Sequence, residues 1–203
     1  SPSGVAAEKG TIVHKVMECL AQAKLAHQQK EDHYIDDHFG QMEVSDYDYI
    51  YSDKFVDDLV DRSYEYYTSK SIHHYTPRHF KDCHKWSHQA ITHCNGAFDP
   101  RNRTVVAPEG SFDFEIKEDW AKYEYELPDG QKLEGQLSLK GTVDLITKVR
   151  DGVFEVIDWK TGRRLDWATG QEKTFKKLTT DPQLRLYHYA LSKVYPEVDQ
   201  FIM

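Results

Sequence analysis

The stretch Gly141–Gly162, GTVDLITKVRDGVFEVIDWKTG, most constrains the fold that this chain can adopt. Its two apolar runs flank Arg150-Asp151-Gly152, which is typical of the turn of a β-hairpin. Asp144 interrupts the first run near its start, and Asp158 and Lys160 interrupt the second near its end. Two carboxylates and an ammonium group therefore stand where a half-buried hairpin would be expected to carry apolar side chains.

The register of this hairpin decides whether its charged residues lie together. A two-residue turn at Asp151-Gly152 would place Asp144 opposite Trp159, with the two aspartates on opposite faces. A three-residue loop would place Asp144 opposite Asp158, and a glycine at the last loop position suits the left-handed conformation needed there. This second register also pairs apolar residues with one another, namely Leu145 with Ile157, Ile146 with Val156, Val149 with Val153 and Val143 with Trp159. We therefore predict the three-residue loop.

In this register one face carries Asp144, Asp158 and Lys160. The other face carries apolar residues: Val143, Leu145, Val149, Val153, Ile157 and Trp159. Adjacent carboxylates repel, so one would hold a proton unless a cation lies between them. Oxygen ligands of this kind suit Mg²⁺ or Mn²⁺, and Lys160 would neutralise a developing oxyanion or position a water beside the metal. The alternative is a solvent-exposed strand face with unrelated polar residues.

The remaining sequence predicts helices first and short strands afterwards. Helical spacing of apolar residues covers Gly10 to about Ala26, Lys54–Ser71, His79 to about His93 and Pro182 to about Tyr195. Strands are predicted at Thr104–Ala107, Phe112–Lys117, Lys122–Leu127, Leu133–Val149, Val153–Lys160 and Val198–Met203. Residues 31–52 lack clear periodicity and are predicted to be irregular. The order indicates an α+β fold with an antiparallel meander, or an α/β fold with a mixed sheet.

Composition sets further limits. The 203 residues fit one domain of ordinary size, and 39% hydrophobic with 30% charged residues can form a core under a polar surface. The sequence has no apolar run long enough to span a membrane and no signal peptide at its start. A secreted disulfide scaffold usually has more cysteines and an even number of them, whereas this chain has three. We therefore expect a reducing, cytoplasmic location.

The charge is uneven along the chain. The net charge of −8 argues against a general nucleic-acid coat protein. Residues 31–61 contain eleven acidic residues and one basic residue, whereas residues 160–177 contain six basic residues against two acidic ones. The basic side chains of Arg163, Arg164, Lys173, Lys176 and Lys177 either follow DNA phosphates or belong to a solvated loop.

Four motifs together resemble a known family. GTVDLI followed by EVIDWKTG is similar to the nuclease core of the PD-(D/E)XK superfamily, specifically its RecB-like exonuclease branch. GTIVHKVMECL resembles the first motif of that branch, a helix that brings a histidine to the metal. DPQLRLYHYAL resembles its last motif, Gln-x-x-x-Tyr. The motifs run in the family's order, and the block from FDPRNRTVVAPEGSFDFEIK to the hairpin resembles versions carried by tailed phages.

The resemblance implies a fold and an activity. The fold would be a mixed central β-sheet flanked by helices, forming one nuclease domain over residues 1–203 with a helical or irregular insertion at about 27–103. The activity would be hydrolysis of DNA phosphodiesters with Mg²⁺ or Mn²⁺. The implied metal ligands are His14, Asp144, Asp158 and the backbone carbonyl of Trp159, with Lys160 as the catalytic lysine. Gln183 and Tyr187 would line the site, and Glu115 and Glu18 would support the metal's surroundings.

Two features leave alternatives open. The chain has no cysteine before His14 and none after Tyr187, so we expect no iron–sulfur cluster of the kind that some RecB-like relatives carry. A second group comprises Cys83, His84, His88, His93 and Cys94. It either binds zinc or belongs to a histidine-rich helix packed on the nuclease core.

Two functional hypotheses follow. The first is an active DNA exonuclease used in recombination, replication or end processing. The second is a non-catalytic DNA- or protein-binding module that serves a helicase or recombination partner. The combination of Asp144, Asp158 and Lys160 favours the first.

Overall fold

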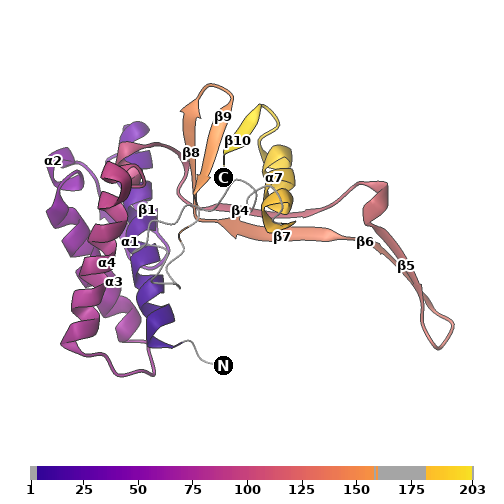
Figure 1. Cartoon of the computed structure of the whole chain (residues 1–203), viewed down its shortest axis with the longest axis horizontal. Helices are drawn as coiled ribbons and strands as arrows, with labels where there is room; N and C mark the ends of the chain where they lie inside the picture. The colour runs from indigo at the N-terminus through magenta and orange to yellow at the C-terminus, as the bar shows by residue number, and fades with distance from the viewer. Residues whose placement is uncertain (1–3, 158, 160–181, 203) are drawn as a thin grey trace.

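The computed structural model describes residues 4–157, 159 and 182–202, with the side chains of residues 182–185 excepted. Its first part is a group of helices, α1 (Val5–Gln28), α2 (Tyr47–Ile50), α3 (Asp53–Thr68) and α4 (Pro77–Gly96), seen together in Figure 1. The helices predicted at the positions of α1, α3 and α4 are confirmed, and α1 begins earlier than its apolar spacing indicated. Sequence-encoded caps set two of the starts: the Ser52 side chain accepts from the Phe55 N–H, and Pro77 opens α4 inside a Thr76–His79 capping box.

A mixed sheet lies beside these helices. Its strands are β3 (Thr104–Ala107), β8 (Leu145–Arg150), β9 (Val153–Ile157) and β10 (Gln200–Ile202), in the order β10-β9-β8-β3. The β3–β8 and β8–β9 pairs are antiparallel and the β9–β10 pair is parallel. The predicted mixed central sheet with flanking helices is thereby confirmed, whereas a purely antiparallel meander is not what forms.

The remaining strands form a long two-stranded extension. β4 (Gly110–Glu115) pairs with β7 (Ser138–Val143), and β5 (Lys122–Glu126) pairs with β6 (Lys132–Gln136) farther out. Figure 1 shows this extension reaching away from the helices, past α7 (Pro182–Val194). The single strand predicted at Leu133–Val149 is therefore wrong, because the chain is divided there into β6, β7 and β8. Each piece has a different partner.

Residues 31–52 are not irregular, which corrects a second prediction. β1 (His33–Asp36) and β2 (Gly40–Glu43) form a small antiparallel hairpin before α2. Asp36 is buried and lies 2.7 Å from the Lys15 ammonium group of α1. Burial alone would raise the pKa of Asp36, but hydrogen bonds from Lys15 and from two backbone N–H groups lower it. The contact between this hairpin and α1 thus includes a buried ion pair. Sequence periodicity detects apolar contacts and did not indicate it.

Two hydrophobic clusters occupy opposite sides of the mixed sheet. The larger joins the helices to Val105, Leu145, Ile157 and Trp159, and the smaller contains Val143, Ile146, Val156 and Leu191. Alternation along β8 and β9 explains the division, because successive side chains point to opposite faces.

Gln28 at the end of α1 also closes the β3 edge, since its side-chain amide exchanges two hydrogen bonds with the backbone of Val105. Among the described residues, no helix is both long and apolar enough to span a membrane.

Candidate metal centre

His14 lies in the middle of α1, at the junction with the β-hairpin. Its Nε2 atom is 2.6 Å from the backbone carbonyl oxygen of Trp159. A carbonyl oxygen only accepts hydrogen bonds, so Nε2 carries the proton in this contact. The imidazole side chain keeps about a third of its surface exposed, at 33%. The ring is thus held by the hairpin and remains open to small ligands.

Asp144 stands at the bend between β7 and β8, beside the backbone of Trp159. Its Oδ2 atom accepts a 2.6 Å hydrogen bond from the Trp159 N–H, and its Oδ1 atom is 3.6 Å from Nδ1 of His14. The two backbone polar groups of Trp159 therefore have separate partners: the N–H orients Asp144, and the C=O contacts His14. The Trp159 side chain is buried in the larger cluster, which anchors this arrangement.

The hairpin register explains why Asp144 reaches this position. Leu145 pairs with Ile157 and Ile146 pairs with Val156, as predicted. The turn itself differs from the prediction, because Arg150 pairs with Val153 across Asp151-Gly152 and the register shifts between Lys148 and Arg150. This bulge absorbs one residue, so a two-residue turn and the predicted register coexist.

The predicted composition of the apolar face needs two corrections. Val149 lies in the bulge and is 44% exposed, so it does not pair with Val153. Val143 packs in the smaller cluster, on the side opposite Leu145, because the chain bends at Asp144 and enters another ladder. Leu145, Ile157 and Trp159 do share the face that packs on the helices.

The groups brought together here fit a divalent cation. An imidazole nitrogen, a carboxylate and a backbone carbonyl are donor types that Mg²⁺ and Mn²⁺ accept. Neighbouring ligands around an octahedral ion with bonds of about 2.1 Å lie about 3 Å apart, and the His14 Nε2 and Trp159 oxygen atoms are 2.6 Å apart. The ion would bind His14 through Nε2 in the tautomer that carries its proton on Nδ1, the nitrogen 3.6 Å from Oδ1 of Asp144. A small increase in the distance between Nε2 and the Trp159 oxygen would then accommodate the ion.

The family model of the PD-(D/E)XK nuclease superfamily matches residues 1–201. The chain belongs to this superfamily. Its members are metal-dependent nucleases, which agrees with the mixed sheet and with the donor set at the hairpin. Neither curated proteins nor solved structures gave a significant match.

Several predicted site residues lie outside the described residues. These are Asp158, Lys160, Arg163, Arg164, Lys173, Lys176 and Lys177, together with the side chain of Gln183. Tyr187, one helical turn after Gln183 in α7, is described. Its ring packs against the smaller cluster and meets Phe112 edge-on at a centroid distance of 5.9 Å.

Of the two supporting carboxylates, only Glu18 lies near His14. It follows His14 by one turn of α1, and burial raises its pKa, with Lys15 opposing and Glu109, Asp36 and Asp37 adding to the rise. Glu115 does not join this group, because it pairs with Ser138 at the far end of the β4–β7 ladder. That position is about 16 Å along the strand from the Gly110–Val143 pair, where β7 meets Asp144.

Glu109 is the acidic residue that sequence reasoning missed. It directly precedes Gly110, whose partner Val143 directly precedes Asp144. Its charge is close enough to Glu18 to influence that carboxyl. The sequence does place Glu109 just before the strand that carries Glu115. Its position near Asp144 follows only once the pairing of β4 with β7 is known.

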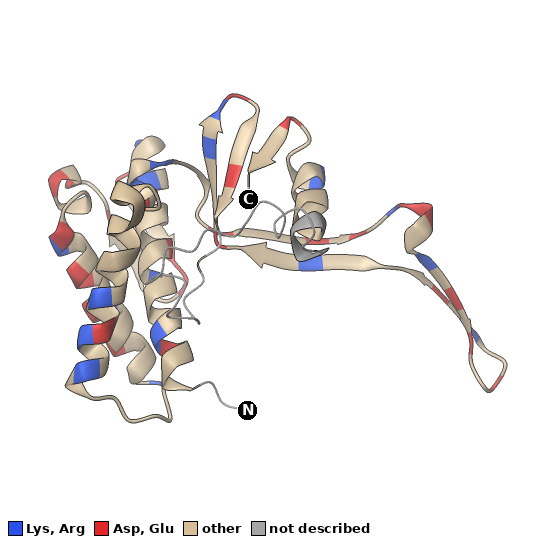
Figure 2. Cartoon of the chain, viewed as in Figure 1, with Lys and Arg blue, Asp and Glu red and all other residues tan. Residues whose placement is uncertain are grey.

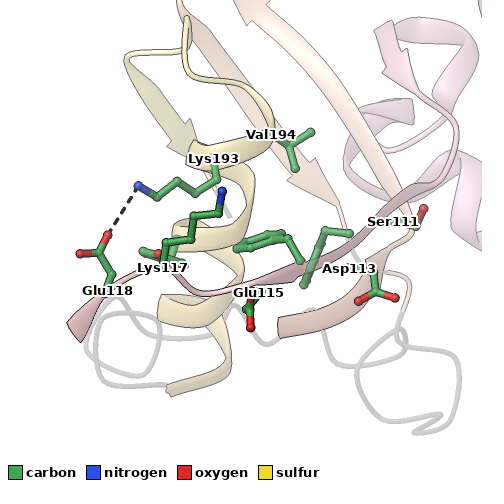
Figure 3. A pocket seen from close by; sticks show the side chains of 10 residues that line it. Ser111, Asp113, Glu115, Lys117, Glu118, Lys193 and Val194 are labelled. Atoms are coloured by element: carbon green, nitrogen blue, oxygen red, sulfur yellow. Dashed lines mark ion pairs between the residues drawn. The ribbon is translucent and has the colours of Figure 1, made fainter. Parts of the chain in front are cut away.

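A separate cavity of about 510 Å³ lies between β4 and α7, and Glu115 is among its lining residues. Figure 3 shows Lys117 and Lys193 on one side of it, with Lys193 paired to Glu118 at 3.8 Å. Neither His14 nor Asp144 lines this cavity. Glu115 therefore belongs to the surface of the extension and not to the candidate metal centre.

Proposed function

We propose that this chain is a divalent-metal-dependent deoxyribonuclease of the RecB-like branch that hydrolyses DNA from its ends. The convergence of His14, Asp144 and the Trp159 carbonyl supports the proposal most strongly, because these groups come from distant parts of the sequence. The order of the four sequence motifs supports the assignment to the RecB-like branch. We further propose that residues 1–203 form one nuclease domain, with the 27–103 insertion inside it.

In this proposal His14, Asp144, Asp158 and the Trp159 carbonyl hold Mg²⁺ or Mn²⁺. When bound, the ion supplies Lewis-acid activation of the scissile phosphate and of a water molecule. The Trp159 N–H fixes one oxygen of Asp144, which leaves the other oxygen facing His14. Holding the donors in place before the ion arrives reduces the reorganisation that binding requires.

Lys160 follows Trp159 directly in the sequence, and its ammonium group would stabilise the charge that develops on the phosphate. Glu18, whose pKa is raised chiefly by burial, would add a carboxylate one turn from His14. Gln183 and Tyr187 would position the DNA strand beside the centre. The basic residues between Arg163 and Lys177 would bind its phosphates.

DNA is the substrate in this proposal, single-stranded or at duplex ends, within recombination, replication or end processing. A helicase or recombination protein would supply the DNA in the cell, and the chain would act in the cytoplasm. Most acidic residues of the insertion lie on α2, α3 and the β1–β2 hairpin (Figure 2), where they would repel DNA and direct it toward the basic segment.

One experiment separates the parts of this proposal. End-labelled linear DNA and closed circular single-stranded DNA are incubated with the protein and Mn²⁺, Mg²⁺ or EDTA. We expect degradation of linear DNA with either metal, none with EDTA, and intact circles. Cleavage of closed circles would contradict the exonuclease assignment alone. Degradation that persists in Lys160→Ala and Asp158→Ala would contradict the assignment of the site.

A further inference from the structure

A second group of metal-binding side chains lies between α3 and α4, and it shares no residue with the proposed nuclease centre. Asp57 and Asp61 are four residues apart on α3, and His84 and His88 are four residues apart on α4. Residues at this spacing occupy the same face of a helix. Figure 1 shows the two helices running side by side, so the pairs face each other across their contact.

The distances within this group are short. Nε2 of His88 is 2.6 Å from Oδ1 of Asp57, and Nδ1 of His84 is 3.2 Å from the same oxygen. The other ring nitrogen of His84, Nε2, is 2.8 Å from Oδ1 of Asp61. The Phe80 ring meets His84 edge-on at 4.7 Å and limits its rotation. Both nitrogens of one imidazole therefore face carboxylate oxygens.

Counting protons shows what this arrangement requires. A neutral imidazole has one N–H donor and one lone pair, and an ionised carboxylate only accepts. If neutral His84 donates to Asp61 through Nε2, the lone pair of Nδ1 points at the oxygen of Asp57. Two electron-rich atoms at 3.2 Å repel unless a positive charge lies between them. That charge is either a second proton on His84 or a metal ion.

The geometry points to a metal ion, and we propose that Asp57, His84 and His88 bind a transition-metal ion of the Zn²⁺ type, with Asp61 orienting His84. A histidine ligand commonly donates its second N–H to a carboxylate, which fixes its tautomer. Asp61 stands where that carboxylate belongs. Two imidazoles and one carboxylate favour Zn²⁺ over Mg²⁺, and ligands on a tetrahedral Zn²⁺ with bonds of about 2.0 Å lie about 3.3 Å apart.

The neighbouring thiols fall outside this site. Cys83 is fully buried, and among the described residues the ligand atoms that converge here come from Asp57, His84 and His88, without a cysteine. His93 stacks on Phe98 and is the first residue at which α4 loses its helical backbone. The candidate site therefore consists of Asp57 and Asp61 from α3 with His84 and His88 from α4, and not of the cysteine- and histidine-rich group suggested by the sequence.

Such an ion would join α3 to α4 within the insertion. The four side chains are between 24% and 55% exposed, so an ion can enter from solvent and retain a coordinated water. Because an ion that binds only the folded state stabilises it, added Zn²⁺ should raise the melting temperature. This effect requires no nuclease activity.

The test is calorimetric titration of Zn²⁺ into the full chain, with excess Mg²⁺ present to occupy the nuclease centre. We compare wild type, His84→Gln, His88→Gln, Asp61→Asn and the matched control His33→Gln, whose histidine is exposed on β1. We expect one Zn²⁺ site in wild type and in His33→Gln, and at least about 100-fold weaker binding in His84→Gln and His88→Gln. Asp61→Asn should weaken binding about 10–100-fold.

Equal Zn²⁺ affinity and equal gain in melting temperature in wild type and in the His84 and His88 variants would overturn the proposal. Absence of Zn²⁺ binding to wild type would overturn it too, leaving a proton as the charge on His84. Circular dichroism checks that the variants fold. If the variants do not fold, the NMR resonances of the His84 and His88 rings in wild type are followed during Zn²⁺ addition. Absence of Zn²⁺-dependent shifts in these resonances would contradict the site.

Discussion

The Nε2 atom of His14 lies 2.6 Å from the backbone oxygen of Trp159, although 145 residues separate them in the chain. This contact joins the first helix to the end of the hairpin that carries Asp144. It holds because the Trp159 side chain is buried against α1 and its N–H binds Asp144.

The first prediction concerns the register of β8. Ile146 is fully buried, whereas Val149 lies in the bulge and is 44% exposed. Ile146→Ala should lower the free energy of unfolding by about 2–4 kcal/mol because it leaves a cavity. Val149→Thr should change it by less than about 0.5 kcal/mol. Denaturant unfolding measures both, and a larger loss at Val149 would contradict the bulge.

The sequence predicted this part of the fold well. Strands β3, β5 and β9 begin at the predicted residues Thr104, Lys122 and Val153, because β5 alternates polar with apolar side chains and β3 and β9 are short runs of mainly apolar ones. It could not predict the division at Asp144, since continuous alternation does not reveal a change of partner strand. It also missed β1 and β2, whose four-residue strands depend on the buried contact between Asp36 and Lys15.

The second prediction concerns the turn. Gly152 has φ = +76°, and a Cβ atom there would lie 2.6 Å from Oδ2 of Asp199. Its carbonyl also accepts hydrogen bonds from the N–H groups of Asp199 and Gln200, which brings β10 to the sheet. Gly152→Ala should lower the free energy of unfolding by about 1–2 kcal/mol.

Gly130 provides the control for this substitution. It also has a positive φ, at +84°, but no atom lies within 4 Å of a Cβ there. Gly130→Ala should therefore cost only the backbone strain. A Gly152→Ala protein no less stable than Gly130→Ala would show that contact with Asp199 is unimportant.

The third prediction concerns pH. The Lys9 ammonium group on α1 lies 2.9 Å from Asp82 on α4, and its hydrogen bond lowers the pKa of Asp82. A carboxyl whose folded pKa lies below its unfolded value of about 3.9 stabilises the protein above that pH. The contribution is lost as the pH falls through the folded pKa. Asp82→Asn should therefore lower the free energy of unfolding by about 1–2 kcal/mol at pH 7, and the difference should shrink below about pH 4.

Asp119→Asn serves as the matched control, because Asp119 also pairs with a lysine, Lys122 at 3.0 Å, but its side chain is 96% exposed. An exposed ion pair contributes little to stability. The unfolding curves of this variant should follow those of wild type at each pH. A loss in Asp82→Asn that is the same at pH 3 and pH 7 would contradict the role of the charged pair.

The candidate centre was predicted partly from residues and partly from resemblance. Hairpin register alone indicated that Asp144 stands at the end of the apolar pairs. The approach of His14 and the Trp159 carbonyl came from the likeness of four motifs to the family, since no periodicity connects α1 to β9. Glu109 was missed because its position depends on the pairing of β4 with β7. In the Asp57–His84–His88 group, the two histidines were recognised from the sequence, but Asp57 was missed because the sequence does not show which helix faces α4.

The central claim is that His14 and Asp144 hold the metal ion used to hydrolyse DNA. The most direct test measures Mn²⁺-dependent degradation of end-labelled linear DNA by wild type, His14→Ala, Asp144→Asn and the control His33→Gln. We predict that His14→Ala and Asp144→Asn lose activity by about 100-fold or more while remaining folded, because each removes a metal ligand. His33→Gln should stay within about twofold of wild type, since surface substitutions are usually neutral. An Asp144→Asn protein that degrades DNA at the wild-type rate would contradict the account.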